Sequence, residues 1–279
     1  MNKYDSKEIL HVKNGDLEYL QFKILNEHNV KNCITLKHGG VSEGELASLN
    51  FRTLGTDKLE NVLTNLEIIS KELNFTNVHK GKQAHTDKVL ILDKENKEEY
   101  VFKNLNPDEV DGYITNEKGI ATLITTADCN PIIIFDTKNR VIANVHAGWK
   151  GVINRIYINA IKVMKEKYNS NVEDIIVCIG PSIRKCCFTS QEESFKEKFT
   201  NSFKYDEDYL EHEEDNKTFH IDLIEILKHE FKERGIKEEN IHVADICTRC
   251  NTEDFYSYRE TVQNKRKDYA TMATIVEIN

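Results

Sequence analysis

The segment TTADCNPIIIFDTKNRVIANVHAGWKG, residues 125–151, decides how this chain folds. Two apolar runs, PIIIF and VIANV, flank the short polar turn TKN, and this pattern predicts a β-hairpin. If Asp136 pairs with Arg140 across the turn, Cys129 and His146 lie nearly opposite each other at the open end of the hairpin. The segment therefore brings a thiol and an imidazole together where the two strands end.

Cys129 and His146 each have two interpretations. A free cysteine is usually a small buried hydrophobe, and a histidine at a strand end usually just makes a hydrogen bond. Both residues, however, leave their strands into irregular segments, ADCNP and HAGWKG, and loops on a rigid sheet often carry function. Gly148 and Gly151 permit a sharp turn before an expected helix, so that Trp149 packs beneath or beside a pocket.

Short β-rich runs and helical periodicities continue along the rest of the chain. Asp57 is expected to cap the first helix, and Asp222 with Glu225 to form the capping box of a helix that Gly235 ends. Hairpins mixed with crossovers indicate an α+β fold, and the lack of a linker or repeat indicates one domain, residues 1–279. The expected strands are 33–36, 89–92, 120–126, 131–135, 141–145, 175–179 and 271–278, and the expected helices are 58–73, 152–168, 191–199 and 222–235.

Composition excludes several classes of partner. The 279 residues carry a formal net charge of -9, and the basic residues are scattered, so no nucleic-acid partner is expected. Seven irregularly spaced cysteines, an opening without an apolar signal core and no stretch of membrane length indicate a reduced, cytoplasmic protein with no membrane partner. We expect a monomer or a weak homo-oligomer, with the charged segment 204–219 as a surface excursion.

His85, in the polar segment KGKQAHTDKV, is a third candidate for the site. His85, Cys129 and His146 together offer two imidazoles and one thiolate, a ligand set suited to Zn²⁺ with a fourth position left for water or substrate. Cu²⁺ is the second candidate ion. Such a site is catalytic in type, whereas a polar loop histidine alone is more often solvated.

Four other cysteines superficially resemble a zinc knuckle. Cys247 and Cys250 form a CxxC pair, with Cys186 and Cys187 as the other half. Adjacent cysteines lack the usual spacer of two to four residues, and a CxxC outside a redox fold is a frequent accident. We therefore interpret these residues as structural thiols.

Motifs spread over almost the whole chain resemble a known family. The segments KQAH (82–85), TTADCNPIIIFD (125–136) and VHAGWKG (145–151), in this order, are the most specific. On these residues the chain resembles the YfiH/YlmD-like laccase-domain proteins, which are regarded as purine nucleoside phosphorylases of broad specificity. Further matches are HGGVSEGELASLN (38–50), VDGYIT (110–115), IGPSI (179–183) and FYSYRE (255–260).

The resemblance implies a fold, a metal site and an activity. The fold would be one of packed mixed β-sheets covered by helices, and the metal ligands would be His85, Cys129 and His146. The substrates would be purine nucleosides and phosphate, with adenosine, inosine, guanosine and 5′-methylthioadenosine cleaved to the base and ribose 1-phosphate. Hydrolytic deamination of adenosine would be a second activity.

Other residues are candidates for supporting roles in this chemistry. Asp128 or Gln83, beside the metal ligands, could orient water or a base edge. Lys150, Arg155 and Arg259 are candidates for binding phosphate. Lys150 stands where the family commonly has arginine, and lysine keeps the charge but loses the bidentate fork, which affects the affinity for phosphate rather than the type of reaction.

Three alternatives to a zinc phosphorylase stay open at this point. A copper-dependent polyphenol oxidase needs many histidine ligands, but the chain has ten histidines and no HxH pair. A cysteine hydrolase would use Cys129 as the nucleophile and His146 as its base, acting on cell-wall precursors. A zinc-stabilised binding module would show no turnover.

Overall fold

The computed structural model describes residues 1–215 and 217–279, with the predicted hairpin at its centre. The hairpin consists of β8 (Asn130–Asp136) and β9 (Val141–Ala147), which pair antiparallel and are buried along their whole length. Strands covered on both faces require continuous apolar runs. The two strands lie in a six-stranded mixed sheet, sheet B, in the order β14 (Ile241–Val243), β10 (Ile175–Ile179), β8, β9, β6 (Gly112–Thr115) and β5 (Val89–Ile91).

The register of the hairpin differs by one residue from the predicted register. Arg140 lies in the turn with a φ of 52°, so Asp136 pairs with the residue that follows it. His146 consequently pairs with Pro131, and Cys129 lies just before its strand. The error arises because the turn has one more residue than predicted, which shifts the pairing of both strands.

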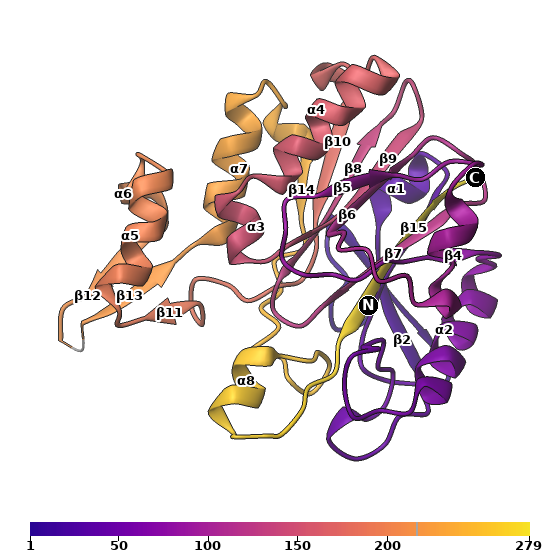
Figure 1. The fold of residues 1–279 in the computed structure, drawn as a ribbon. Coiled ribbons are helices and arrows are strands. Elements are labelled where there is room, and N and C mark those ends of the chain that lie inside the picture. Colours follow the sequence, from indigo (N-terminus) through magenta and orange to yellow (C-terminus); the bar gives the residue numbers. More distant parts are fainter. Residues whose placement is uncertain (216) are drawn as a thin grey trace.

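A second six-stranded sheet, sheet A, packs against sheet B (Figure 1). Its strand β15 (Met272–Ile278) is buried throughout, and Val276 on this strand belongs to the same apolar cluster as Phe135 of sheet B. In spatial order, sheet A contains β1 (Ile9–Asn14), β2 (Leu17–Phe22), β3 (Val30–Thr35), β15, β7 (Ala121–Thr126) and β4 (Val78–His79).

Helices cover the outer faces of the two sheets, which gives a helix–sheet–sheet–helix arrangement (Figure 1). Val62 and Ile69 of α2 join the apolar cluster of sheet A, while Ile156 of α4 and Leu227 of α7 join that of sheet B. The helices are α1 (Lys23–Glu27), α2 (Leu59–Leu73), α3 (Trp149–Ile153), α4 (Ile156–Tyr168), α5 (Glu193–Ser202), α6 (Asp206–Tyr209), α7 (Leu223–Glu233) and α8 (Tyr258–Gln263).

A small three-stranded sheet projects from this body together with α5 and α6 (Figure 1). The expected surface excursion, 204–219, contributes α6, one whole strand and part of another, although residue 216 lies outside the described residues. Tyr209 within it is fully buried. The strands, in spatial order, are β11 (Thr189–Ser190), β13 (Thr218–Ile221) and β12 (Leu210–Glu213).

The helix ends confirm one predicted cap and contradict another. The Asp222 carboxylate accepts the backbone N–H groups of Ile224 and Glu225 at the start of α7, as predicted. The Glu225 half of the predicted capping box does not form, because the Asp222 N–H donates to the Tyr209 carbonyl and the Glu225 carboxylate pairs with Lys228. Asp57 does not cap α2, because its carboxylate accepts hydrogen bonds from Ser42 and other side chains, and Lys58 occupies the cap position.

The predicted helix 152–168 is in fact two helices. The first, α3, already begins at Trp149, and Arg155 adopts a left-handed conformation with a φ of 57° between α3 and α4. A residue with positive φ cannot continue a right-handed helix. The chain changes direction at this break, and the side chain of Arg155 points toward α7.

The predicted α+β class and all seven predicted strands are confirmed. Strands such as β1 and β12 were missed, because their polar residues hide the apolar pattern. In the part of the chain that the structure describes, no helix has the length and apolar character needed to span a membrane.

Candidate metal site and substrate cavity

Three segments bring the predicted ligands together. His85 comes from the loop before β5, Cys129 from the turn between β7 and β8, and His146 from the end of β9. The Cys129 sulfur lies 3.7 Å from His85 Nε2, and the two imidazole rings are 4.7 Å apart. One ligand atom from each residue lies within 4.8 Å of the other two.

Asp111 is the carboxylate that holds both histidines in place. His146 Nδ1 lies 2.8 Å from Asp111 Oδ1, and the backbone N–H of His85 donates to the same oxygen. The other oxygen accepts the backbone N–H groups of Ala84 and Thr86. Asp111 is fully buried, so these bonds replace all of its hydration. A carboxylate behind a histidine is the usual support of a metal-binding imidazole, because it leaves the opposite nitrogen free for the ion.

The charges of this cluster depend on one another. Burial would raise the pKa of Asp111, but the hydrogen bond and charge of His146 lower it to about 2. Burial likewise opposes ionisation of Cys129, but His146 and His85 lower the pKa of its thiol to about 6. The pKa of His146 is raised, against the effect of burial, by the Cys129 thiolate and Asp111. Each shift therefore favours the charged form, a thiolate at Cys129 and an imidazolium at His146.

Gly148 leaves the space in which these ligands meet. A Cβ atom at this position would lie 2.7 Å from His85 Cδ2 and 3.0 Å from the Cys129 sulfur. Any larger residue would push the two ligands apart. The next residue, Trp149, begins α3, packs edge-on against Phe195 and lines the adjoining cavity, as predicted for this turn.

The donor set fits a single thiophilic ion. Two imidazole nitrogens and a low-pKa thiol converge, and the supporting carboxylate already uses the far nitrogen of His146. Zn²⁺ accepts such a three-ligand set and keeps a position for water or substrate. Copper accepts imidazole and thiolate as well.

A cavity of about 620 Å³ opens beside the three ligands. Its volume suits a small organic molecule. Leu54, Leu105 and Tyr258 are exposed large apolar side chains that line it. The basic residues that line it are Arg52, Lys80, Lys82 and Lys150.

Of the predicted supporting residues, Gln83 and Lys150 line this cavity. The Gln83 side chain bonds to the backbone N–H and the carbonyl of Thr125 at the end of β7. The Gln83 amide therefore attaches the loop that contains His85 to strand β7 of sheet A. Lys150 is exposed, with its Nζ 5.6 Å from the centre of the Trp149 ring.

The structure does not bring Asp128, Arg155 and Arg259 to the cavity wall among the described residues. The Asp128 carboxylate accepts bonds from the Thr248 and Ser257 hydroxyls, and burial raises its pKa. The Asp128 carboxylate therefore links the segments of Thr248 and Ser257 to the turn of Cys129, and it is too buried to contact a water or a purine base in the cavity.

Arg155 and Arg259 are both engaged with the protein itself. Arg155 Nε donates to Glu230 of α7 at 2.6 Å, because the break between α3 and α4 directs its side chain there. Arg259 Nη1 donates to the carbonyl oxygen of Cys187 at 2.9 Å. The prediction that they bind phosphate does not agree with these positions.

Two residues of the site were missed from the sequence. Asp111 stands in VDGYIT, where a carboxylate directly before an apolar strand was a usable signal. Lys80 lines the cavity, and burial lowers its pKa to about 8 against the attraction of Asp111. No spacing in the sequence links Lys80 to the site.

Packed mixed sheets that present two histidines and a cysteine beside a cavity define a class of α+β proteins whose site could hold a metal ion. The chain belongs to the family described as multi-copper polyphenol oxidoreductase laccase, whose model matches residues 31–279.

Relatives and a solved structure agree with this assignment. The chain is 30% identical over 252 residues to a purine nucleoside phosphorylase of Bacteroides thetaiotaomicron, covering 88% of this chain and 92% of the relative. It is 28% identical to adenosine deaminase RL5 of an unknown prokaryotic organism, over 67% of this chain and 71% of that protein. The crystal structure of YfiH from Bacillus licheniformis has the same fold, with a TM-score of 0.86 at 21% identity, covering 98% of this chain and all of that one.

Proposed function

We propose that the protein is a zinc-dependent purine nucleoside phosphorylase with adenosine deaminase side activity. The substrates are adenosine, inosine, guanosine and 5′-methylthioadenosine, which react with phosphate to give the base and ribose 1-phosphate. The observation that carries the proposal is the ligand set of His85, Cys129 and His146 on the wall of a cavity of about 620 Å³. The names of the relatives supply the reaction class.

The cavity offers separate surfaces for the two substrates. Tyr258 and Tyr269 lie 5.1 Å apart edge-to-face on its wall and suit the faces of a purine ring. Lys80 and Lys150 offer positive charge for phosphate and for the negative charge that develops on the leaving purine. Arg52 is less available, because it pairs with Asp268 at 2.6 Å.

Phosphorolysis forms a bond from a phosphate oxygen to the ribose C1′ and breaks the bond from C1′ to the purine nitrogen, which takes up a proton. Bound zinc would supply a Lewis acid, or a water activated near neutral pH for deamination. The protein's own residues bind and orient. Asp111 fixes the tautomer and direction of His146, and Gln83 holds the loop of His85.

Product analysis tests this function. Zinc-loaded protein incubated with adenosine and phosphate is expected to release adenine and ribose 1-phosphate. Without phosphate, only deamination should occur, and inosine should be the only product. Chromatography of both reactions, with Cys129→Ala as the control for a contaminating enzyme, measures these products. Adenine release that is independent of phosphate, or no turnover of any of the four nucleosides, would contradict the proposal.

A cysteine hydrolase is the second candidate, because Cys129, His146 and Asp111 also form a thiolate–imidazolium–carboxylate series. The two candidates differ in what zinc does. In the phosphorylase, zinc occupies the thiolate, whereas in the hydrolase the thiolate must stay free. A polyphenol oxidase has less support, since only this one histidine-containing ligand group occurs among the described residues.

Alkylation of Cys129 distinguishes these candidates. In chelator-treated protein, iodoacetamide is expected to modify Cys129 already at neutral pH, because the pKa of its thiol is lowered to about 6. Cys33 and Cys178 are the controls, since both are buried with raised pKa values and should stay unmodified. Peptide mass mapping reads out the sites. Zinc should protect Cys129, and equal alkylation with and without zinc would show that the thiol is not a ligand.

A further inference from the structure

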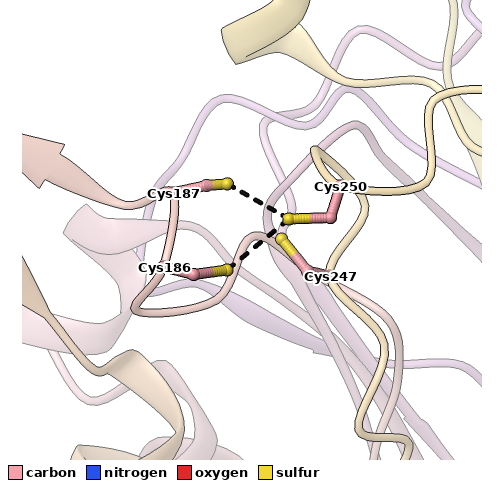
Figure 2. A group of neighbouring side chains, drawn as sticks. All are labelled: Cys186, Cys187, Cys247 and Cys250. Atoms are coloured by element: carbon pink, nitrogen blue, oxygen red, sulfur yellow. Dashed lines mark hydrogen bonds between the residues drawn. The ribbon is translucent and has the colours of Figure 1, made fainter.

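Four cysteines outside the cavity gather into a second cluster. Cys186 and Cys187 lie on the turn after β10, and Cys247 and Cys250 on the segment after β14 (Figure 2). Figure 2 shows their sulfur atoms turned toward one another from the two segments. All four sulfurs lie within 4.8 Å of one another.

The spacing of the sulfurs is that of thiolates around one ion. Cys250 Sγ lies 3.7 Å from Cys186 Sγ and 3.4 Å from Cys187 Sγ. In a tetrahedral zinc site, bonds of about 2.3 Å place the sulfurs about 3.8 Å apart. A disulfide would need about 2.05 Å. The four thiols therefore need only small shifts to surround a cation.

The backbone around the cluster is built to hold it. The backbone N–H of Cys187 donates to the Arg184 carbonyl at 2.8 Å, and Asn251 Nδ2 donates to the Cys247 carbonyl at 2.8 Å. Thr248 N–H donates to the Ser182 carbonyl, which joins the two segments directly beside the cysteines. The positions of the sulfurs thus follow from a connected framework.

A buried cation stands next to the cluster. Arg184 is 8% exposed, and its charge acts on Cys186 and Cys247. Its Nη2 donates to the carbonyl oxygens of Gly180 and Ala244, while Nε and Nη1 have no hydrogen-bond partner among the described residues. Four thiolates around a divalent cation carry a net charge of about -2, which the guanidinium would partly neutralise.

We propose that Cys186, Cys187, Cys247 and Cys250 bind a second, structural Zn²⁺ ion. Four protein ligands close the coordination sphere, which is the mark of a structural site rather than a catalytic one. The ion displaces the thiol protons to solvent on binding. The objection from sequence, that adjacent cysteines lack a spacer, does not apply, because the two halves of the site come from separate segments and the turn directs both sulfurs to one side.

The site would join the small sheet to the segment that leads to the cavity. Cys187 precedes β11, and its carbonyl oxygen accepts a hydrogen bond from the Arg259 guanidinium of α8. Thr248, between the other two cysteines, donates to the buried Asp128 beside Cys129. Binding of the ion is therefore expected to raise thermal stability.

Metal content of the reduced full-length protein tests this proposal. We expect about two zinc ions per chain by elemental analysis, one for each cysteine-containing group. The double variant Cys247→Ser/Cys250→Ser should keep one, and so should His146→Ala. Cys33→Ala, a buried cysteine in neither group, is the matched control and should keep both.

Three further readouts make the outcome decisive. Cobalt-loaded wild-type protein should show thiolate-to-cobalt absorption that persists in His146→Ala, and this requires no cysteine variant to fold. The double serine variant should melt at a lower temperature yet keep cavity zinc and nucleoside turnover, which separates this proposal from the proposed function. A zinc content that is the same in the double variant as in the wild type, iron in place of zinc, or a disulfide within the cluster of reduced protein would overturn it.

Discussion

The variant His146→Ala is expected to lose the cavity metal and both activities together. His146 is 3% exposed, and its Nδ1 is already bonded to Asp111, so Nε2 is its remaining donor atom for an ion near Cys129. Losing one ligand of three should lower the zinc affinity by several kcal/mol, on the order of a thousandfold or more. Phosphorolysis and deamination depend on the same ion in the proposed function. Zinc content, melting temperature and adenosine turnover, measured on one preparation, check this result.

A second buried histidine provides the matched control. His11 is 1% exposed, lies on β1 and pairs with Glu18 at 2.9 Å, with no contact to the cavity. His11→Ala should lower stability by about 1 to 3 kcal/mol and leave zinc content and activity per folded molecule unchanged. If His146→Ala behaves in the same way, His146 is a core histidine and not a metal ligand.

The variant Asp111→Ala is expected to combine a loss of metal affinity with a loss of stability. Asp111 supports His146 through Nδ1 and fastens the loop of His85 through three backbone N–H groups. Removing such a supporting carboxylate typically costs about 10–100-fold in metal affinity. The buried N–H groups left without an acceptor should lower the free energy of unfolding by about 3 kcal/mol or more. Zinc titration and denaturant unfolding measure the two effects.

Rescue by metal separates this positioning role from that of a ligand. Asp111→Ala keeps all three ligands, so excess zinc should restore turnover, whereas it should not restore His146→Ala. Asp136 is an equally buried carboxylate at the other end of the hairpin, where it accepts the backbone N–H groups of Lys138 and Asn139. Asp136→Ala should therefore lower stability with no change in zinc affinity. An equal loss of zinc affinity in both variants would mean that Asp111 acts only through stability.

Much of the fold and part of the site follow from local patterns in the sequence. The runs PIIIF and VIANV are apolar because β8 and β9 are covered on both faces, so their strands could be predicted without any partner. A hairpin also brings its own ends together, which placed Cys129 near His146 even though the predicted register was wrong by one residue. His85 was weaker as a prediction, since its contact with Cys129 spans 44 residues.

Only the tertiary structure decided the parts that join distant segments. Asp111 reaches His146 across 35 residues, and Cys187 meets Cys250 across 63, through the packing of β-sheets that no local spacing records. Arg155 was predicted to bind phosphate from its charge alone. Its own left-handed backbone conformation, between α3 and α4, directs its side chain toward Glu230. Local sequence determines which strands form and what stands at their ends, because side-chain periodicity is a property of neighbouring residues. Which of those ends meet depends on how sheets and helices stack, because contacts between distant segments form only when the whole core is assembled.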